Sequence, residues 1–226
     1  MSDDAPAVSA PRRWVIIVLA CLAIGGLAFA IGRFSTFGAS SVAAAPSTDS
    51  AEAGFARDMQ VHHGQAVEMA MQIYRTTDDT ELRTLAYDIA TGQSAQRGEM
   101  FDWLVQWGLP QAGAPLMSWM ADADGAHGEH AAASGEPLDE AELRALMGMA
   151  TDAELGELRD TTGGEADCLF LELMIRHHEG AIPMAEAVIE QATEPRVLTV
   201  ATSIRNGQTA EIDAMKSMQA RLGCVG

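Results

Sequence analysis

Apolar residues recur every three or four positions along four long stretches of the chain, the spacing that gathers them on one face of an α-helix. Turn-forming glycine, proline and small polar residues separate these stretches. The predicted long helices cover about 49–74, 79–107, 165–191 and 195–223. No segment reads as a confident strand, so the sequence predicts an all-α protein.

A connecting insert, residues 108–163, separates the second and third long helices. Its first part is rich in Gly, Ala, Pro and Asp and is predicted to form a loop. A short helix is predicted over 139–147. A second opens at Thr151, where Glu154 three residues later completes a capping box. The glycine pair 163–164 is expected to break the chain before the third long helix.

The first and third long helices carry the same motif, F-x-x-x-M-x-x-H-H-x-x-A-x-x-M-A. The two copies lie 115 residues apart, and this offset gives 14 identities in the 46 positions from Phe55 to Met100. Each copy is interpreted as one helical hairpin, and two such hairpins form a four-helix bundle with an internal pseudo-twofold axis. The motif residues are Phe55, Met59, His62, His63, Ala66, Met69 and Ala70, repeated as Phe170, Met174, His177, His178, Ala181, Met184 and Ala185.

The segment Trp14–Ile31 contains no charged residue and is about long enough to cross the hydrocarbon core of a membrane. Arg12 and Arg13 precede it, and the positive-inside rule places that end in the cytoplasm. The sequence therefore predicts a single-pass cell-membrane protein. Its parts are a cytoplasmic tail (1–13), a transmembrane anchor (14–37), a flexible linker (38–50) and an extracytoplasmic domain (51–226).

A cleaved signal peptide is the alternative for this segment, because Ala43 and Ala45 form an A-x-A pattern. Three features oppose cleavage: the apolar run is long for a signal peptide, the site lies well beyond its end, and Pro46 would follow the cut. An uncleaved anchor is the preferred interpretation.

The chain beyond the apolar segment is strongly acidic. Removing Asp3, Asp4, Arg12, Arg13 and Arg33 from the totals of 32 acidic and 14 basic residues leaves 30 and 11. This excess argues against nucleic acid or anionic lipid as a partner. It would concentrate cations near the surface, although solubility alone also explains it.

Cys168 and Cys224 are expected to form a disulfide. They fall near the start of the third long helix and just beyond the end of the fourth, so an antiparallel hairpin brings them to the same end. An extracytoplasmic compartment permits such a bond. Two separate buried thiols are the alternative, and Cys21 belongs to the apolar segment.

The repeated motif has the composition of a metal site. On a helix its methionine, histidines and alanines share one face, so both histidines of a pair can lean inward. If the pseudo-twofold axis makes the first and third helices neighbours, all four imidazoles meet at mid-bundle. The alternative is a core stripe with buried, hydrogen-bonded histidines, but burying four polar rings is costly unless each has a partner.

The other residues of the motif favour copper. A ferritin-like di-iron centre needs Glu-x-x-His, and here Met59 and Met174 stand where that glutamate would be. Thioether and imidazole together suit Cu(I) best, while zinc bound by histidine alone is the alternative. The candidate ligands are Met59, His62, His63, Met69, Met174, His177, His178 and Met184.

The insert contains further pairs of possible metal ligands, which suit transient capture of Cu(I) by a mobile loop. They can equally be core methionines and solvated histidines. The auxiliary candidates are Met117, Met120, His127, His130, Met147 and Met149.

Three more positions of the long helices bear on the site. Gln93 and Gln208 occupy matching places on the second and fourth helices and are candidates to support the ligands or to join the helices. Pro183 replaces the Glu68 of the first copy and is expected to kink the third helix, so that the two halves of the site differ.

The doubled motif resembles the bacterial family known as domain of unknown function 305, over about Ser50 to Gly223. The resemblance implies a ferritin-like helical bundle and, since some members are periplasmic or secreted copper-binding proteins, a link to copper tolerance. The predicted function is copper binding for tolerance, buffering or delivery, with another membrane or extracytoplasmic copper protein as a possible partner. The alternatives are a metal-dependent oxidase and a structural subunit of a membrane complex without metal. Binding is preferred to catalysis because no substrate pocket or general base is evident beyond the histidines.

Overall fold

The computed structural model describes residues 11–37, 44–120 and 138–224, and the chain divides into two compact units, 1–44 and 45–226. The first unit contains the single helix α1 (Pro11–Phe37). The apolar side chains described on it, from Trp14 to Phe29, are exposed. Within the described residues, no helix has the length and hydropathy needed to cross a membrane.

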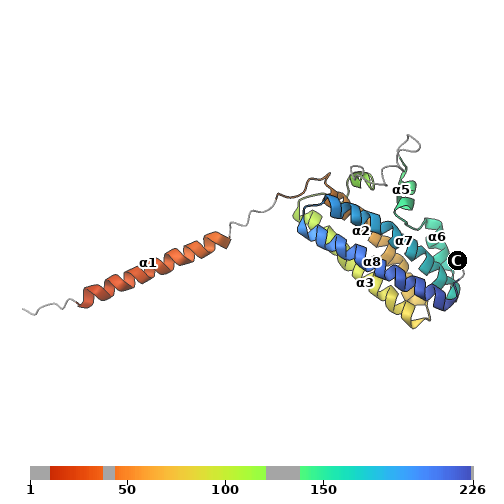
Figure 1. Ribbon diagram of the computed structural model, residues 1–226, viewed down its shortest axis with the longest axis horizontal. Coiled ribbons are helices and arrows are strands. Elements are labelled where there is room, and N and C mark those ends of the chain that lie inside the picture. Colours follow the sequence, from red (N-terminus) through yellow and green to blue (C-terminus); the bar gives the residue numbers. More distant parts are fainter. Residues whose placement is uncertain (1–10, 38–43, 121–137, 225–226) are drawn as a thin grey trace, which may run out of the picture. The chain divides into compact units, whose positions relative to one another are not determined.

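The second unit is built on four long helices in two hairpins, and no strand occurs in its described residues. Helices α2 (Ala51–Thr76) and α3 (Thr80–Gln106) form the first hairpin, and α7 (Gly163–Gln191) and α8 (Pro195–Leu222) form the second. Helix α2 packs along α7, so the two helices that carry the repeated motif are neighbours (Figure 1). The all-α prediction is confirmed.

Local sequence explains where the long helices begin. The side chains of Ser50 and Asp79 accept hydrogen bonds from the first turns of α2 and α3, which leaves Asp49 just outside the helix. Helix α7 starts at Gly163 rather than beyond the glycine pair. Gly163 has a φ of 64°, which glycine adopts without strain, and it turns the chain directly into the helix. The prediction of a break at 163–164 is therefore wrong, because the helix starts two residues before the predicted position 165. Helix α7 continues through Pro183 to Gln191.

The hydrophobic core consists of two clusters, and the 115-residue offset relates motif residues of one cluster to those of the other. One contains Phe55, Met59 and Met100, and the other contains their counterparts Phe170, Met174 and Met215. All six side chains are fully buried. Each cluster joins the early part of one motif helix to the late part of the other, because Met59 shares its cluster with Met184, and Met69 shares its cluster with Met174. Helices α2 and α7 are therefore antiparallel, and the layer of histidines lies between the two clusters.

The described part of the insert lies against α2 and α7. It comprises the short 3-10 helix η1 (Ser118–Met120) and helices α5 (Glu140–Leu146) and α6 (Asp152–Asp160). Trp119 anchors η1: a Cβ at Gly54 would fall 2.3 Å from its ring, so the absence of a side chain there allows close contact. The buried Asp58 carboxylate accepts hydrogen bonds from Trp119 Nε1 and the Met117 amide.

A disulfide joins Cys168, in the first turns of α7, to Cys224, just after α8, with a Cα–Cα distance of 5.4 Å. It closes the open end of the second hairpin. The corresponding positions of the first hairpin are Ala53 and Leu109, so only one hairpin carries this cross-link. Cys21 is free and exposed in the N-terminal unit.

We expect the Cys168→Ser/Cys224→Ser variant to lose about 4 kcal/mol of unfolding free energy, because the bond closes a loop over a sequence separation of 56 residues. Urea unfolding of the oxidised protein measures this loss, and the Cys21→Ser variant is the control. Equal midpoints for the double variant and wild type would contradict the prediction.

Candidate functional site

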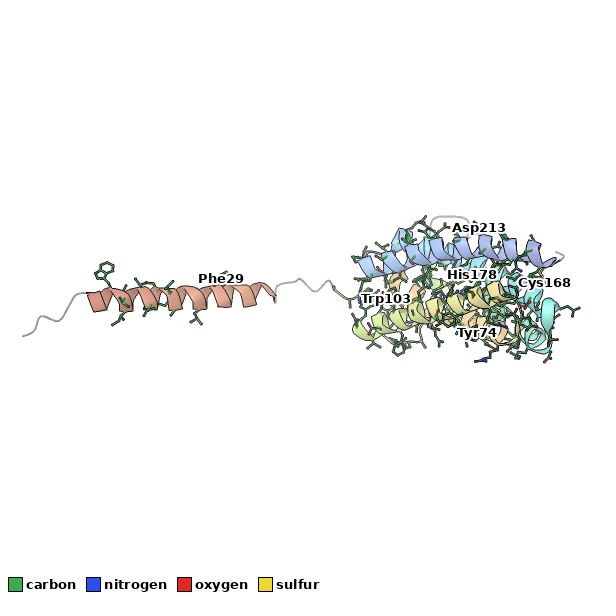
Figure 2. All side chains as sticks on the ribbon, turned by 90° about the horizontal axis from the view of Figure 1, so that it is seen from below. Phe29, Tyr74, Trp103, Cys168, His178 and Asp213 are labelled. Carbon is green, nitrogen blue, oxygen red and sulfur yellow. A yellow bond between two sulfur atoms is a disulfide. The ribbon has the colours of Figure 1, made fainter. Side chains whose placement is uncertain are left out.

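Four histidines from the two motif helices meet in the middle of the bundle. We call His62, His63, His177 and His178 the histidine centre; every one of these side chains is completely buried. The rings of His62 and His177 stack across the α2–α7 interface with centroids 3.6 Å apart and planes inclined by 33°. His63 and His178 lie 6.3 and 6.2 Å from their sequence neighbours, and Figure 2 shows His178 within the bundle.

Each imidazole uses its Nε2 atom for one hydrogen bond. His62 Nε2 lies 2.9 Å from the carbonyl oxygen of Met147 in the insert, and His177 Nε2 lies 3.1 Å from the carbonyl oxygen of His62. A carbonyl oxygen only accepts, so both Nε2 atoms carry the proton and donate. Helix α2 and the insert are thereby tied to the centre.

The other two rings point their Nε2 atoms at the outer helices. His63 Nε2 lies 2.8 Å from Gln96 Oε1 on α3, and His178 Nε2 lies 2.7 Å from Glu211 Oε2 on α8. Both oxygens accept a hydrogen bond from the Nε2–H group of the ring. Gln96 and Glu211 are related by the same 115-residue offset as the histidines. The same position of the repeat therefore supplies the hydrogen-bond acceptor in each half.

The Nδ1 atoms of all four imidazoles are buried and have no hydrogen-bond partner. Burial lowers the pKa of His62 to about 3 and that of His63 to about 4, and holds the pKa of His177 well below its usual 6.5. Repulsion from neighbouring histidines adds to the effect for His62 and His177. These three rings are therefore neutral near pH 7, with their proton on Nε2 and an electron pair free on Nδ1. That tautomer is the one in which Nδ1 can bind a metal ion.

Methionines lie on both sides of the histidine centre. Met59 and Met184 form the first methionine layer, and Met69 and Met174 form the second. All four side chains are fully buried. One methionine stands three residues before each histidine pair, so its thioether lies about one helical turn from the imidazoles on the same face of the helix.

The segment 147–150 covers the centre where the insert meets α2 and α7. Gln65 on α2 holds it by two hydrogen bonds to the backbone of Ala150, of 2.7 and 2.8 Å. On α7, a Cβ at Gly180 would fall 2.0 Å from the Met147 carbonyl oxygen, so glycine is required for this contact. Gly180 is the counterpart of Gln65 in the repeat. The insert therefore makes side-chain hydrogen bonds with α2 and a close backbone contact with α7 at equivalent positions.

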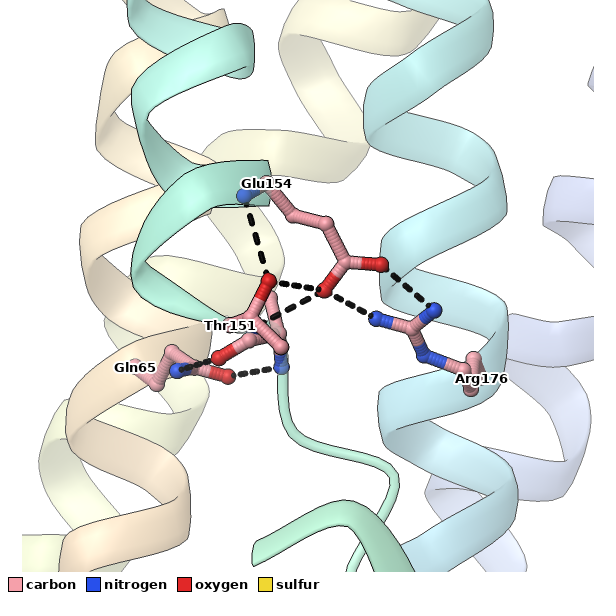
Figure 3. Close-up of polar contacts among 5 residues, drawn as sticks. Gln65, Thr151, Glu154 and Arg176 are labelled. Atoms are coloured by element: carbon pink, nitrogen blue, oxygen red, sulfur yellow. Dashed lines mark hydrogen bonds and ion pairs between the residues drawn. The ribbon is translucent and has the colours of Figure 1, made fainter. Parts of the chain in front are cut away.

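A polar network fixes the start of α6 beside this segment (Figure 3). Thr151 and Glu154 form the predicted capping box. The Glu154 carboxylate also pairs with Arg176 of α7 at 2.8 Å, and this guanidinium lowers the pKa of Glu154 to about 2. The insert is thus attached to both motif helices next to the histidine centre.

The auxiliary methionines are mostly core residues. Met120, Met147 and Met149 are buried in the same cluster as the first methionine layer, and Met117 packs against it partly exposed. Met117 has a φ of 59°, an unusual conformation that directs its amide toward Asp58. The histidines of the insert, His127 and His130, lie outside the described residues.

Counting only His, Cys, Asp and Glu, the described residues contain no group of three or more arranged to hold a metal ion. The atoms that could hold a metal ion here are the unpartnered Nδ1 atoms together with methionine sulfur, a combination of ligand types that suits a soft monovalent ion.

The sequence pattern did not reveal the partners of the histidines. Gln93 and Gln208, the amides chosen from identity between the repeats, are buried but make no hydrogen bond. The residues that do bind the rings stand one turn later, at Gln96 and Glu211, and differ between the copies. Gln96 and Glu211 each stand 33 residues after the second histidine of a pair. This shared spacing identifies them as partners only once the packing of the hairpins is known.

Fold and site together define a duplicated four-helix bundle with a buried centre of histidine and methionine. The chain belongs to the family described as Domain of unknown function (DUF305), whose model matches residues 52–219. The resemblance seen in the sequence is thereby confirmed.

Solved structures share this fold. A DUF305 protein from Streptomyces coelicolor is 39% identical, with a TM-score of 0.67 over 79% of this chain and 96% of that one. A DUF305 fragment from Deinococcus radiodurans is 30% identical, with a TM-score of 0.60 over 76% and 96%. CopM in its Cu(I)-bound form is 24% identical, with a TM-score of 0.53 over 75% and 96%, which shows a common fold. No match is found among curated proteins.

Proposed function

We propose that this protein binds copper, preferentially Cu(I), at the histidine centre. One observation carries the proposal: four completely buried imidazoles keep their Nδ1 atoms unpartnered between two layers of methionine. Buried polar atoms normally have partners, and four unpaired ring nitrogens in one layer call for a ligand. The Nε2 hydrogen bonds orient the rings in the way that outer partners orient metal-ligating histidines.

The donor set favours Cu(I) over other ions. Neutral imidazole and thioether ligands suit a soft monovalent cation, whereas Mg²⁺ and Ca²⁺ require oxygen ligands. CopM, which shares the fold, has been solved in Cu(I)-bound, Cu(II)-bound and Ag-bound forms. Zinc bound by histidine alone is the weaker alternative, since it would make no use of the methionines.

We further propose that the bundle works outside the cytoplasm, held to the membrane by the apolar segment 14–37, in copper tolerance, buffering or delivery. The uncharged run after Arg12 and Arg13 and the disulfide in the bundle support this location. Another membrane or extracytoplasmic copper protein would be the exchange partner. Fractionation of cells, with protease digestion of intact spheroplasts, tests the location; bundle protected from protease would contradict it.

Metal analysis of the protein purified without chelator, followed by anaerobic competition with a chromophoric Cu(I) chelator, tests the proposed activity. We expect tight Cu(I) binding and weaker Zn(II) binding. Protein that takes up no metal would instead support a structural subunit. Oxygen consumption coupled to Cu(I) or Fe(II) would support an oxidase.

Replacing Met59 and Met174 with leucine is expected to weaken Cu(I) binding at least about tenfold, which corresponds to 1.4 kcal/mol. Zn(II) and Cu(II) affinities should hardly change, because thioethers contribute little to these ions. The matched control is Met100→Leu/Met215→Leu, an equally buried and equally duplicated pair on α3 and α8. Equal losses for the three metals, or for the two variants, would show that Met59 and Met174 only pack.

A further inference from the structure

The two halves of the histidine centre differ in one chemical respect. The ring of His63 donates to the neutral amide of Gln96, whereas the ring of His178 donates to the carboxylate of Glu211. The positions are equivalent in the repeat, and the distances, 2.8 and 2.7 Å, are nearly the same. The geometry of the hydrogen bond is thus preserved, while the acceptor carries a formal negative charge in one half only.

A buried cation makes this difference important. Cu(I) bound by imidazoles and thioethers alone would leave a full positive charge in a layer from which solvent is excluded, and such a charge is costly without a partner. Among the described residues, Glu211 is the carboxylate that is hydrogen-bonded to an imidazole of the centre. Asp58 is also buried on α2, but it is engaged by the amide of Met117 and the indole of Trp119.

The surroundings of Glu211 suit this task. It lines a small cavity of about 50 Å³ between α3 and α8, together with the buried, unpartnered amides of Gln93 and Gln208. Its side chain is 30% exposed, while that of His178 is completely buried. The carboxylate can therefore keep part of its hydration and still hold the ring of a metal ligand, and these amides supply polar neighbours rather than hydrocarbon.

We propose that Glu211 is the counter-charge and positioning residue of the copper centre, acting through His178; this rests on the proposed function. A carboxylate that accepts from Nε2–H increases the electron density at Nδ1, which strengthens the ring as a ligand. It also compensates the charge of the ion across a single imidazole. His178 is then the dominant histidine ligand, and the pseudo-symmetric centre is functionally asymmetric.

The internal repeat supplies a direct test with three variants of the full-length protein in detergent. Glu211→Gln should weaken Cu(I) binding about 10- to 100-fold, the range typical for partners of metal-ligating histidines. Combining it with Gln96→Glu moves the carboxylate to the other half and should restore affinity to within about threefold of wild type. Glu179→Gln is the control for net charge, since this exposed neighbour of His178 forms an ion pair with Lys216 and, within the described part of the chain, with no other residue. It should bind Cu(I) like wild type.

Two further measurements exclude a purely structural role. Ag(I), which does not change oxidation state, should show the same ranking of variants. Because a counter-charge matters more for a divalent ion, Glu211→Gln should lose more Cu(II) than Cu(I) affinity. Each tenfold loss of Cu(II) affinity beyond the loss of Cu(I) affinity would raise the reduction potential of the bound copper by about 59 mV. A variant that had merely loosened the bundle would lose affinity for both oxidation states alike and would not be rescued by Gln96→Glu.

NMR of the metal-free protein provides a readout that does not depend on copper. The Nε2 proton of His178 should be slow to exchange and lie further downfield than that of His63, because its acceptor is charged. It should move upfield in Glu211→Gln. Unchanged Cu(I) affinity in Glu211→Gln, with wild type binding normally, would overturn the inference alone. If wild type binds no Cu(I), the proposed function and the counter-charge role are both overturned. This holds even if the NMR shift demonstrates the hydrogen bond between His178 and Glu211.

Discussion

Replacing all four residues of the histidine centre with leucine is expected to abolish Cu(I) binding, with a loss of more than about 1,000-fold, or 4 kcal/mol. The variant removes every unpartnered Nδ1 atom and leaves both methionine layers in place. Leucine is close to histidine in size, so the core stays filled, and the four unpartnered Nδ1 atoms disappear. The cost is the hydrogen bond that the Met147 carbonyl, Gln96 and Glu211 each lose, about 1–3 kcal/mol for an acceptor that stays buried. The expected product is therefore a folded bundle without a metal site.

Anaerobic chelator competition and circular dichroism of the same sample measure the two halves of this prediction. The Met100→Leu/Met215→Leu protein serves as a control for altered core packing. If the quadruple variant kept one tightly bound copper ion, the histidine centre would not be the site. The methionines and histidines of the insert, from Met117 to Met149, would then become the principal candidates.

The metal-free protein is expected to lose stability steeply as the pH falls below about 6. In the folded state the pKa of His62 is about 3 and that of His63 about 4, and that of His177 is also well below 6.5. In the unfolded chain these rings take up a proton near pH 6.5. Between these limits the unfolded state binds more protons, so the free energy of unfolding decreases as the pH decreases.

Asp58 acts in the opposite direction. Burial raises its pKa from 3.8 to about 6, so in this range the folded state holds one proton more than the unfolded chain at that residue. For these four residues alone, three histidines less one aspartate leave a difference of about two protons near pH 5. Each proton changes the unfolding free energy by about 1.4 kcal/mol per pH unit, which gives on the order of 3 kcal/mol per pH unit near pH 5. A domain of ordinary stability would unfold between about pH 4 and 5.

Urea unfolding at pH 7.0, 6.0 and 5.0 tests this dependence, and the quadruple leucine variant is its control. The control should be much less sensitive to acid, because it lacks the groups that gain protons on unfolding. Excess Cu(I) should shift the wild-type transition to lower pH, since a bound ion occupies Nδ1 and competes with protons. Identical unfolding midpoints at pH 7.0 and 5.0 would contradict the assignment of the rings as neutral and buried.

Much of the architecture follows from the sequence itself. Apolar spacing predicts each long helix to within a few residues, because a helix one face of which is buried must repeat its apolar side chains every 3.6 positions. The duplicated motif predicts two equivalent hairpins, and the buried pairs Met59 with Met174 and His62 with His177 occupy equivalent places. The motif also carries the family resemblance that the model match over 52–219 confirms.

The partners of the histidines could not be predicted in this way. Whether His178 meets Gln208 or Glu211 depends on the rotation and axial position of α8 against α7, and a shift of less than one turn exchanges the two. Likewise, the Met147 carbonyl reaches His62 only because the missing side chain at Gly180 lets the insert lie on α7.

Helical periodicity and internal repetition are properties of a segment or of the chain compared with itself, so the sequence alone determined the helices, the duplication and the residues of the centre. Hydrogen-bond partners, the tautomers that they impose and the burial that keeps the rings neutral depend on atoms brought together from separate helices. The tertiary structure alone decided these, because contacts within about 3 Å are set by how the hairpins pack and not by spacing along any one of them.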